Sequence, residues 1–361
     1  MSLQFIFGNS GSGKSHYLYQ QIVEESIRHP EKNYLVLVPE QFTMQTQKDL
    51  CMAHPRGGIM NIDVLSFGRL AHRVFEETGK ERQPILDDEG KNLVLRKIAG
   101  NYEDELTVLK GNLKKQGYIS EVKSVISEFT QYGIDFEQLD SFMEGLNPES
   151  YLYYKLKDIR KVYEGFEDYL RDKYITKEEL LDVLSQNVAE AKMLKDSVIA
   201  MDGFTGFTPV QNRLIGELLK VCDKIVLTVE IDRREDPFIY KHPYQLFALS
   251  KQMVTSLTEV AQEVKVEIDE PVWLCKNPPY RFKENPEMAF LEEELFRYSR
   301  RKYSGEKMQS ISLHEVHTPQ EEAQYVAEEI RRLVREEGYR YREIAVIASD
   351  RNTYADSLEK A

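Results

Sequence analysis

The sequence predicts an α/β fold in which a helical insertion interrupts a parallel β-sheet. Three observations predict it. Between residues 1 and 78, short apolar runs alternate with segments of helical periodicity, which is typical of a doubly wound sheet. From 85 to 194, strand-like runs nearly vanish and amphipathic helical segments follow one another. Apolar runs return at 198–202 and 224–231, so we expect the sheet to resume after the insertion.

The first part of the chain carries the patterns of three strands and their connecting helices. Residues 3–7 form an apolar run that leads into a glycine-rich loop, and residues 14–29 have apolar side chains near helical spacing. The apolar run at 34–39 ends at Pro39, as expected for a parallel strand that is covered on both faces. Residues 61–67 are a third strand candidate, and a helical pattern follows them.

The last part of the chain predicts a second, incomplete α/β unit. A helix at 245–263 precedes an irregular, proline-rich stretch at 271–309. Strand, helix and strand patterns then follow at 310–318, 319–337 and 343–349. Two parallel strands cannot bury both faces of a sheet, so we expect the chain to be the front part of a longer protein. Packing of this unit on the first sheet is the alternative.

Composition and charge exclude several classes of protein. The chain is 41% hydrophobic and 30% charged, which is typical of a globular protein. It has no apolar run of about 18 residues that could span a membrane, and no signal-peptide pattern. Cys51, Cys222 and Cys275 form no C-x-x-C pair, which fits a reducing cytoplasm rather than a disulfide framework. A net charge of −13 argues against a general duplex-coating protein, although a local basic groove is compatible with it.

A phosphate-binding motif lies between the first strand and the helix after it. The motif is G-x-x-x-x-G-K-S, formed by Gly8, Asn9, Ser10, Gly11, Ser12, Gly13, Lys14 and Ser15. Glycines let backbone N–H groups curl around phosphates, the lysine reaches the β and γ oxygens, and the serine hydroxyl ligates Mg²⁺. The motif predicts that these residues bind ATP with Mg²⁺. The alternative is a glycine- and serine-rich turn that binds no ligand.

Hydrolysis of the nucleotide would require an acidic residue at the end of a neighbouring strand. Asp202 ends the apolar run at 198–202, and we expect it to hold Mg²⁺ together with Ser15; a turn or helix-capping aspartate is the alternative. Gly203 follows it, where a helicase motor would carry the glutamate that orients the attacking water. The seven residues before Gly8 leave no room for the adenine-binding glutamine segment of such motors. We therefore assign no catalytic residue and expect little or no DNA-stimulated turnover.

Five blocks of the sequence together resemble a known family. They are FGNSGSGKS, LVLVPEQFTMQTQ, NIDVLSFGRLAHRVFEETG, MDGFTGFTPVQNRLI and GYRYREIAVIASDRNTY, in this order along the chain. They are similar to AddB, the family of B subunits of the bacterial AddAB helicase–nucleases, which is related to superfamily 1 helicases of the UvrD type. The resemblance implies a role in processing broken DNA ends for recombinational repair, with an AddA-type helicase–nuclease subunit as the partner that supplies the motor.

The resemblance also implies a domain layout. A RecA-like P-loop domain of the 1A type would comprise residues 1–84 and 195–308, with an all-helical insertion of the 1B type at 85–194. A second RecA-like domain of the 2A type would begin at 309–361. The nuclease domain and iron–sulfur cluster of the family would lie outside residues 1–361, so we expect no iron–sulfur cluster in this segment.

In related helicases, single-stranded DNA contacts the loops that follow the second and third strands. The resemblance places five candidate DNA-binding residues there: Gln41, Thr43, Phe67, Arg69 and His72. Phe67 could stack on a base and Arg69 could contact a phosphate. The side chains of Gln41 and Thr43 could hydrogen-bond base edges. The alternative is ordinary packing, with Phe67 in the core and Arg69 in a surface ion pair.

Three other phenylalanines near these loops are weaker candidates. We expect Phe42 to lie in the core. We also expect Phe204 and Phe207 to be core residues rather than platforms on which bases stack.

Three functions are compatible with the sequence. The first is a scaffold that holds single-stranded DNA, binds ATP without acting as a motor, and in the family recognises the recombination hotspot. The second is an active DNA-stimulated ATPase or helicase. Gly203 counts against it, and so does Ser349, because helicases tend to carry an arginine there and Arg351 is displaced by two residues. The third is a small-molecule kinase, but the chain lacks a compact lid with converging arginines.

Overall fold

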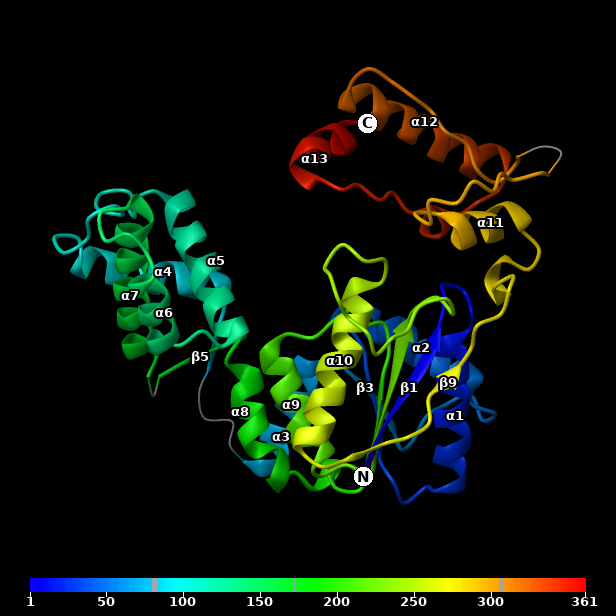
Figure 1. Cartoon of the computed structure of the whole chain (residues 1–361), viewed down its shortest axis with the longest axis horizontal. Helices are drawn as coiled ribbons and strands as arrows, with labels where there is room; N and C mark the ends of the chain where they lie inside the picture. Colours follow the sequence, from blue (N-terminus) through cyan, green and yellow to red (C-terminus); the bar gives the residue numbers. More distant parts are fainter. Residues whose placement is uncertain (80–83, 172, 306–307) are drawn as a thin grey trace. The chain divides into compact units, whose positions relative to one another are not determined.

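The computed structural model describes residues 1–79, 84–171, 173–305 and 308–361, which form two compact units (Figure 1). The first unit is Met1–Glu284 and contains the sheet and the helical insertion. The second unit is Asn285–Ala361, in which the described elements are helical. No helix in the described part of the chain is both long and apolar enough to cross a membrane.

A seven-stranded sheet forms the centre of the first unit. Its strands are β1 (Ser2–Gly8), β2 (Tyr34–Leu37), β3 (Ile62–Leu65), β6 (Val198–Met201), β7 (Lys224–Glu230), β8 (Glu267–Ile268) and β9 (Val272–Trp273). The order is β3-β2-β6-β7-β1-β8, β9 also pairs with β1, and every pair is parallel. β2 pairs with β6, so strands from before and after the helical insertion join one sheet. The predicted α/β class with a resumed parallel sheet is confirmed.

Helices cover both faces of this sheet (Figure 1). They are α1 (Lys14–Arg28), α2 (Thr43–Ala53), α3 (Phe67–Thr78), α8 (Leu180–Asn187), α9 (Pro209–Leu219) and α10 (Ala248–Glu263). Successive strand residues point to opposite faces. Phe5 and Phe7 therefore pack in one core with α3, α8, α9 and α10, while Ile6 packs in the other with α1 and α2. Short 3-10 turns are η1 (Glu40–Phe42), η2 (Val188–Glu190), η3 (Lys192–Leu194) and η4 (Tyr280–Phe282).

The helical insertion has a hydrophobic core of its own. Its helices are α4 (Asp88–Asn101), α5 (Gln116–Tyr132), α6 (Phe136–Glu144) and α7 (Tyr151–Leu170). Leu95, Ile126 and Phe166 are among the residues of this core. The short parallel strands β4 (Ile85–Leu86) and β5 (Ile175–Thr176) pair where the chain enters and leaves these helices. α8 lies inside the range 85–194 but packs on the sheet, because its Leu184 belongs to the core under α3 and α9.

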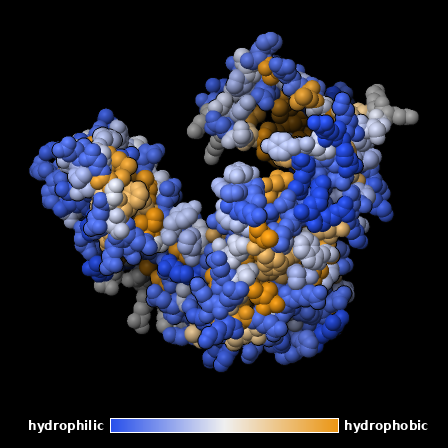
Figure 2. Space-filling view, in the orientation of Figure 1, coloured by the Kyte–Doolittle hydropathy of each residue, from blue (hydrophilic) through white to orange (hydrophobic). Residues whose placement is uncertain are grey.

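The second unit corrects part of the sequence-based prediction. Its helices are α11 (Pro286–Glu294), α12 (Pro319–Glu336) and α13 (Arg351–Lys360), with a 3-10 turn η5 (Tyr341–Glu343). The predicted helix at 319–337 is confirmed, but the strands predicted at 310–318 and 343–349 are wrong. A strand needs hydrogen bonds from a neighbouring strand, and the described residues of this unit form none. Leu313 and Ile347 are 97% and 95% exposed, and hydrophobic surface is open on this unit (Figure 2).

Candidate functional site

The glycine-rich loop, residues 8–13, joins the end of β1 to the start of α1. Gly11 and Gly13 have φ angles of +74° and +92°, in the left-handed region that side chains rarely adopt. A Cβ on Gly8 would lie 2.9 Å from the backbone carbonyl oxygen of Leu274. The turn therefore requires glycine at these positions. It leads into the N-terminus of α1, where free N–H groups and the helix dipole favour an anion.

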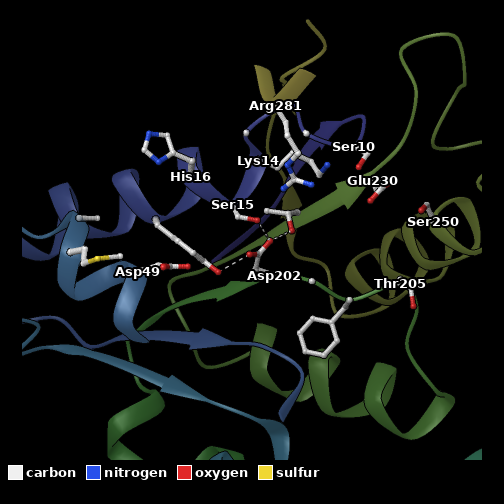
Figure 3. Close-up of a pocket in the computed structure, with 18 residues that line it drawn as sticks. Ser10, Lys14, Ser15, His16, Asp49, Asp202, Thr205, Glu230, Ser250 and Arg281 are labelled. Carbon is white, nitrogen blue, oxygen red and sulfur yellow. Dashed lines mark hydrogen bonds between the residues drawn. The ribbon is translucent and has the colours of Figure 1, made fainter. Parts of the chain in front are cut away.

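A cavity of about 690 Å³ opens beside this loop in the first unit (Figure 3). Lys14 lines the cavity, and its Nζ donates a hydrogen bond to Asn9 O at 3.0 Å. Burial lowers the pKa of Lys14, and the carboxylates of Glu230 and Asp202 oppose this shift. The cavity therefore holds a partly desolvated cation, which is suited to bind an anionic ligand.

The carboxylate of Asp202 lies next to the loop and is 7% exposed. It accepts hydrogen bonds from three hydroxyls, those of Ser15 at 3.1 Å, Tyr19 at 2.7 Å and Thr228 at 2.5 Å. Burial, and then the Asp202 charge, raise the pKa of Tyr19, so this phenol stays a donor. The carboxylate is thus held in one orientation beside the Ser15 hydroxyl.

The donor set at this point fits a magnesium ion that binds together with a nucleotide. Hydroxyl and carboxylate oxygens are ligands that Mg²⁺ prefers, and the ion usually takes one or two carboxylates plus substrate phosphates. Ser15 and Asp202 provide one oxygen of each kind, 3.1 Å apart. Among the described residues, no group of three or more His, Cys, Asp or Glu side chains could hold a metal ion, so the phosphates of a nucleotide would have to supply further ligands at this site.

Gly203, the residue after Asp202, has a left-handed backbone. Its φ angle is +77°, and a Cβ at this position would lie 3.7 Å from Pro39 and 3.8 Å from Phe42. The space would accept a side chain, but the backbone angle would strain any residue other than glycine. A glutamate at position 203 would therefore not adopt this backbone conformation without strain, unlike the glutamate that follows the corresponding aspartate in a helicase motor.

Three charged residues outside the sequence motifs also line the cavity, namely Asp49, Glu230 and Arg281. Glu230 ends β7 and pairs in register with Gly8. Its signal in the sequence is the one that identified Asp202, an apolar strand followed by an acid. Arg281 lies in η4, and its backbone N–H donates a hydrogen bond to Gly11 O at 3.0 Å. A Cβ added to Gly11 would lie 2.7 Å from the Cβ of Arg281. No local pattern points to Arg281, because its segment reaches the loop through the pairing of β9 with β1.

The polar DNA-binding candidates follow two neighbouring parallel strands, β2 and β3, so their loops meet at one edge of the sheet. Gln41, Arg69 and His72 are exposed, and the last two lie three residues apart on α3, which places them on one face. Thr43 is 3% exposed, and its hydroxyl donates to Glu40 O at 3.0 Å. The structure therefore presents three of these four side chains to solvent.

The aromatic candidates are distributed differently from the expectation. Phe67 is 8% exposed, with ring centroids 5.5 Å from Phe204 and 6.2 Å from Phe207. Ser66 caps α3, and the first turn that follows directs Phe67 into the core, so its ring is not available to a base in this structure. The expectation that Phe42 lies in the core is wrong, because it is 48% exposed at the end of η1.

The seven-stranded parallel sheet with helices on both faces defines an α/β protein, and the G-x-x-x-x-G-K-S sequence lies at the end of its β1 strand. The chain belongs to the AddB family: the family model described as ADDB, N-terminal, matches residues 5–292. The resemblance noted from the five sequence blocks is confirmed.

Similar curated proteins are named as the B subunit of an ATP-dependent helicase/deoxyribonuclease. The protein of Lachnoclostridium phytofermentans is 40% identical and aligns with 100% of this chain and 32% of its own length. The protein of Clostridium perfringens strain SM101 is 33% identical over 98% of this chain and 30% of its own length. The protein of Clostridium tetani is 32% identical over 100% of this chain and 31% of its own length. The chain spans about a third of the length of these relatives.

Proposed function

We propose that the chain is the N-terminal, helicase-like region of the B subunit of a helicase–nuclease, and that it binds ATP with Mg²⁺ without being a motor by itself. The contact between Ser15 and Asp202, beside Lys14 in one cavity, carries this proposal. It brings a metal-binding hydroxyl and carboxylate together with a phosphate-binding ammonium group.

The roles of the side chains follow from their chemistry. Loop N–H groups and Lys14 would hold the β- and γ-phosphates, and Ser15 with Asp202 would hold Mg²⁺, which when bound offsets phosphate charge. The hydroxyls of Tyr19 and Thr228 keep the Asp202 carboxylate oriented. Arg281 adds a second positive charge to the cavity lining.

The domain layout is part of the same proposal. A RecA-like domain would comprise 1–84 and 195–308, with the helical insertion at 85–194 and the start of a second RecA-like domain at 309–361. The pairing of β2 with β6 and the separate core of α4–α7 support the first two assignments, except that α8 at the end of the range 85–194 packs on the sheet. The third rests on the family resemblance. The three cysteines are far apart in the sequence, which agrees with an iron–sulfur cluster outside this segment.

The proposed cellular role is processing of double-strand DNA breaks for recombinational repair, and the proposed location of the protein is the cytoplasm. The names of the relatives, which describe one subunit of a helicase/deoxyribonuclease, support an AddA-type partner. Single-stranded DNA would cross the exposed side chains of Gln41, Arg69 and His72, because ligands of open α/β sheets sit at the carboxyl ends of the strands. Recognition of a recombination hotspot would use the same path.

Calorimetry with Mg²⁺-ATP tests the nucleotide site. Lys14→Ala should abolish the binding heat, because it removes the ammonium group from the phosphate end of the cavity. Lys157→Ala is the matched control, since Lys157 is an exposed lysine of α7 outside the cavity. Equal heats for wild type and Lys14→Ala would overturn the proposal.

The alternative function is an active DNA-stimulated ATPase or helicase. The intact Ser15–Asp202 pair favours it, and the left-handed Gly203 disfavours it. An ATPase assay with and without single-stranded DNA separates the two functions. Strong stimulation by DNA, lost in Lys14→Ala, would establish the motor.

A further inference from the structure

Four acidic residues lie at and just after the end of β7: Glu230, Asp232, Glu235 and Asp236. Asp236 accepts a hydrogen bond from the backbone N–H of Phe238 at 2.9 Å. Asp232 is paired with Arg234 at 2.6 Å, and Glu235 with the buried Lys251 at 2.5 Å. Glu230 has no ion pair within 4.0 Å among the described residues, yet it lines the cavity. Its carboxylate therefore faces the cavity without serving an internal ion pair.

Strand geometry places this carboxylate on the side of Asp202. Thr228 and Glu230 are two residues apart on β7 and so point to the same face. Thr228 donates its hydroxyl hydrogen bond to Asp202, which itself accepts from Ser15. Two residues of strand advance about 6–7 Å, so Glu230 lies one repeat beyond Thr228 toward the carboxyl edge of the sheet.

The phosphate-binding loop flanks Glu230 on its other side. Glu230 pairs in register with Gly8, the first residue of the loop. Figure 3 draws Glu230 at the end of its strand, with Ser10 of the loop labelled beside it. Among the charged groups that act on Lys14, Glu230 is the strongest in raising its pKa. The carboxylate is therefore at the phosphate end of the cavity, beyond the Ser15–Asp202 pair.

We propose that Glu230 is a catalytic residue that orients the attacking water during slow, DNA-independent hydrolysis of a bound nucleoside triphosphate. It would take the role that Gly203 cannot fill, and the inference rests on the nucleotide site proposed above. The water oxygen forms a bond to the terminal phosphorus, and the bond from this phosphorus to the bridging oxygen breaks. The electron pair of that bond leaves with the nucleoside diphosphate. The water proton passes to the Glu230 carboxylate and then to solvent.

The test compares Glu230→Gln with Glu259→Gln in the 361-residue chain. Glu259 is an exposed residue of α10 that does not line the cavity, so its replacement makes the same change of charge away from the proposed nucleotide site. Phosphate release from Mg²⁺-ATP without DNA should fall about 10²–10⁴-fold in Glu230→Gln, the usual contribution of a general base. Calorimetry should show ATP binding at least as tight as in wild type, because a negative charge near the phosphates is removed. Glu259→Gln should match the wild type in both measurements.

The outcomes separate this inference from the proposal on which it rests. If the wild type binds ATP but releases no more phosphate than Lys14→Ala, the role of Glu230 is wrong and the nucleotide site stands. Equal turnover of Glu230→Gln and wild type would refute it as well. If the wild type binds no ATP, both proposals fail. Melting curves of both glutamine variants should match the wild type, since both side chains are exposed.

Discussion

The candidate nucleotide-binding residues and the candidate DNA-binding residues lie along one sheet, but the fold brings only the first group together. Five of the residues 8–15, from the glycine-rich loop and the start of α1, line one cavity together with Asp202, and the Ser15 hydroxyl donates a hydrogen bond to Asp202. The DNA-binding candidates divide instead: Gln41, Arg69 and His72 face solvent, whereas Thr43 and Phe67 are buried. A contiguous motif carries its geometry in its own backbone. A set of side chains from separate loops depends on what else packs beside each loop.

The largest expected effect concerns the two phenylalanines of these loops. Phe67→Ala should lower the free energy of unfolding by about 3–5 kcal/mol, because it leaves a cavity against Phe204 and Phe207. Phe42→Ala, the matched control at an exposed position, should change it by about 0.5 kcal/mol or less. Urea unfolding of the two variants measures the difference.

The same pair of variants can break the comparison. If Phe67→Ala unfolds like the wild type and loses affinity for single-stranded DNA, its ring leaves the core to stack on a base. Loss of DNA affinity in Phe42→Ala with unchanged stability would instead identify Phe42 as the aromatic contact of this edge, where stacking contributes about 1–3 kcal/mol per base.

A smaller effect is expected at Gly203, which lies between the two groups. Gly203→Ala should destabilise the chain by about 1–2 kcal/mol, because alanine must adopt the left-handed φ of +77°. Gly206→Ala is the control: a Cβ there meets no atom within 4 Å and its φ is not left-handed, so stability should change by about 0.5 kcal/mol or less. Thermal melting compares them, and equal melting temperatures would show that the loop after β6 adapts.

The smallest expected effect is at Arg69. Arg69→Ala should weaken binding of single-stranded DNA and reduce the slope of log affinity against log salt by about 0.7, the value for one phosphate contact. Arg56→Ala is the control, because Arg56 is exposed but precedes β3 and so lies at the opposite edge of the sheet. Fluorescence anisotropy at several salt concentrations measures both. An unchanged slope for Arg69→Ala would move the DNA path away from this loop.

Most strands and helices of the first unit follow from the sequence, because apolar periodicity and a parallel sheet buried on both faces leave a strong local pattern. The glycine-rich loop also follows from the sequence, because Gly8 and Gly13 determine the path of its backbone and Lys14 begins helix α1 directly after it. The strands predicted at 310–318 and 343–349 do not form, because a strand depends on a partner that the local pattern does not contain.

By itself, the sequence determined the α/β class, the position of the glycine-rich loop after β1 and the acidic residue Asp202 after β6. Tertiary structure alone decided that Phe67 is covered while Phe42 is exposed, since Phe204 and Phe207 come from a distant loop. It also decided that Glu230 and Arg281 line the same cavity as Lys14. The pairing of β2 with β6 brings the loop of Phe204 and Phe207 to Phe67. The pairing of β1 with β7 and β9, more than two hundred residues away in the sequence, brings Glu230 and Arg281 to the cavity. No local pattern records which distant strand will be the neighbour.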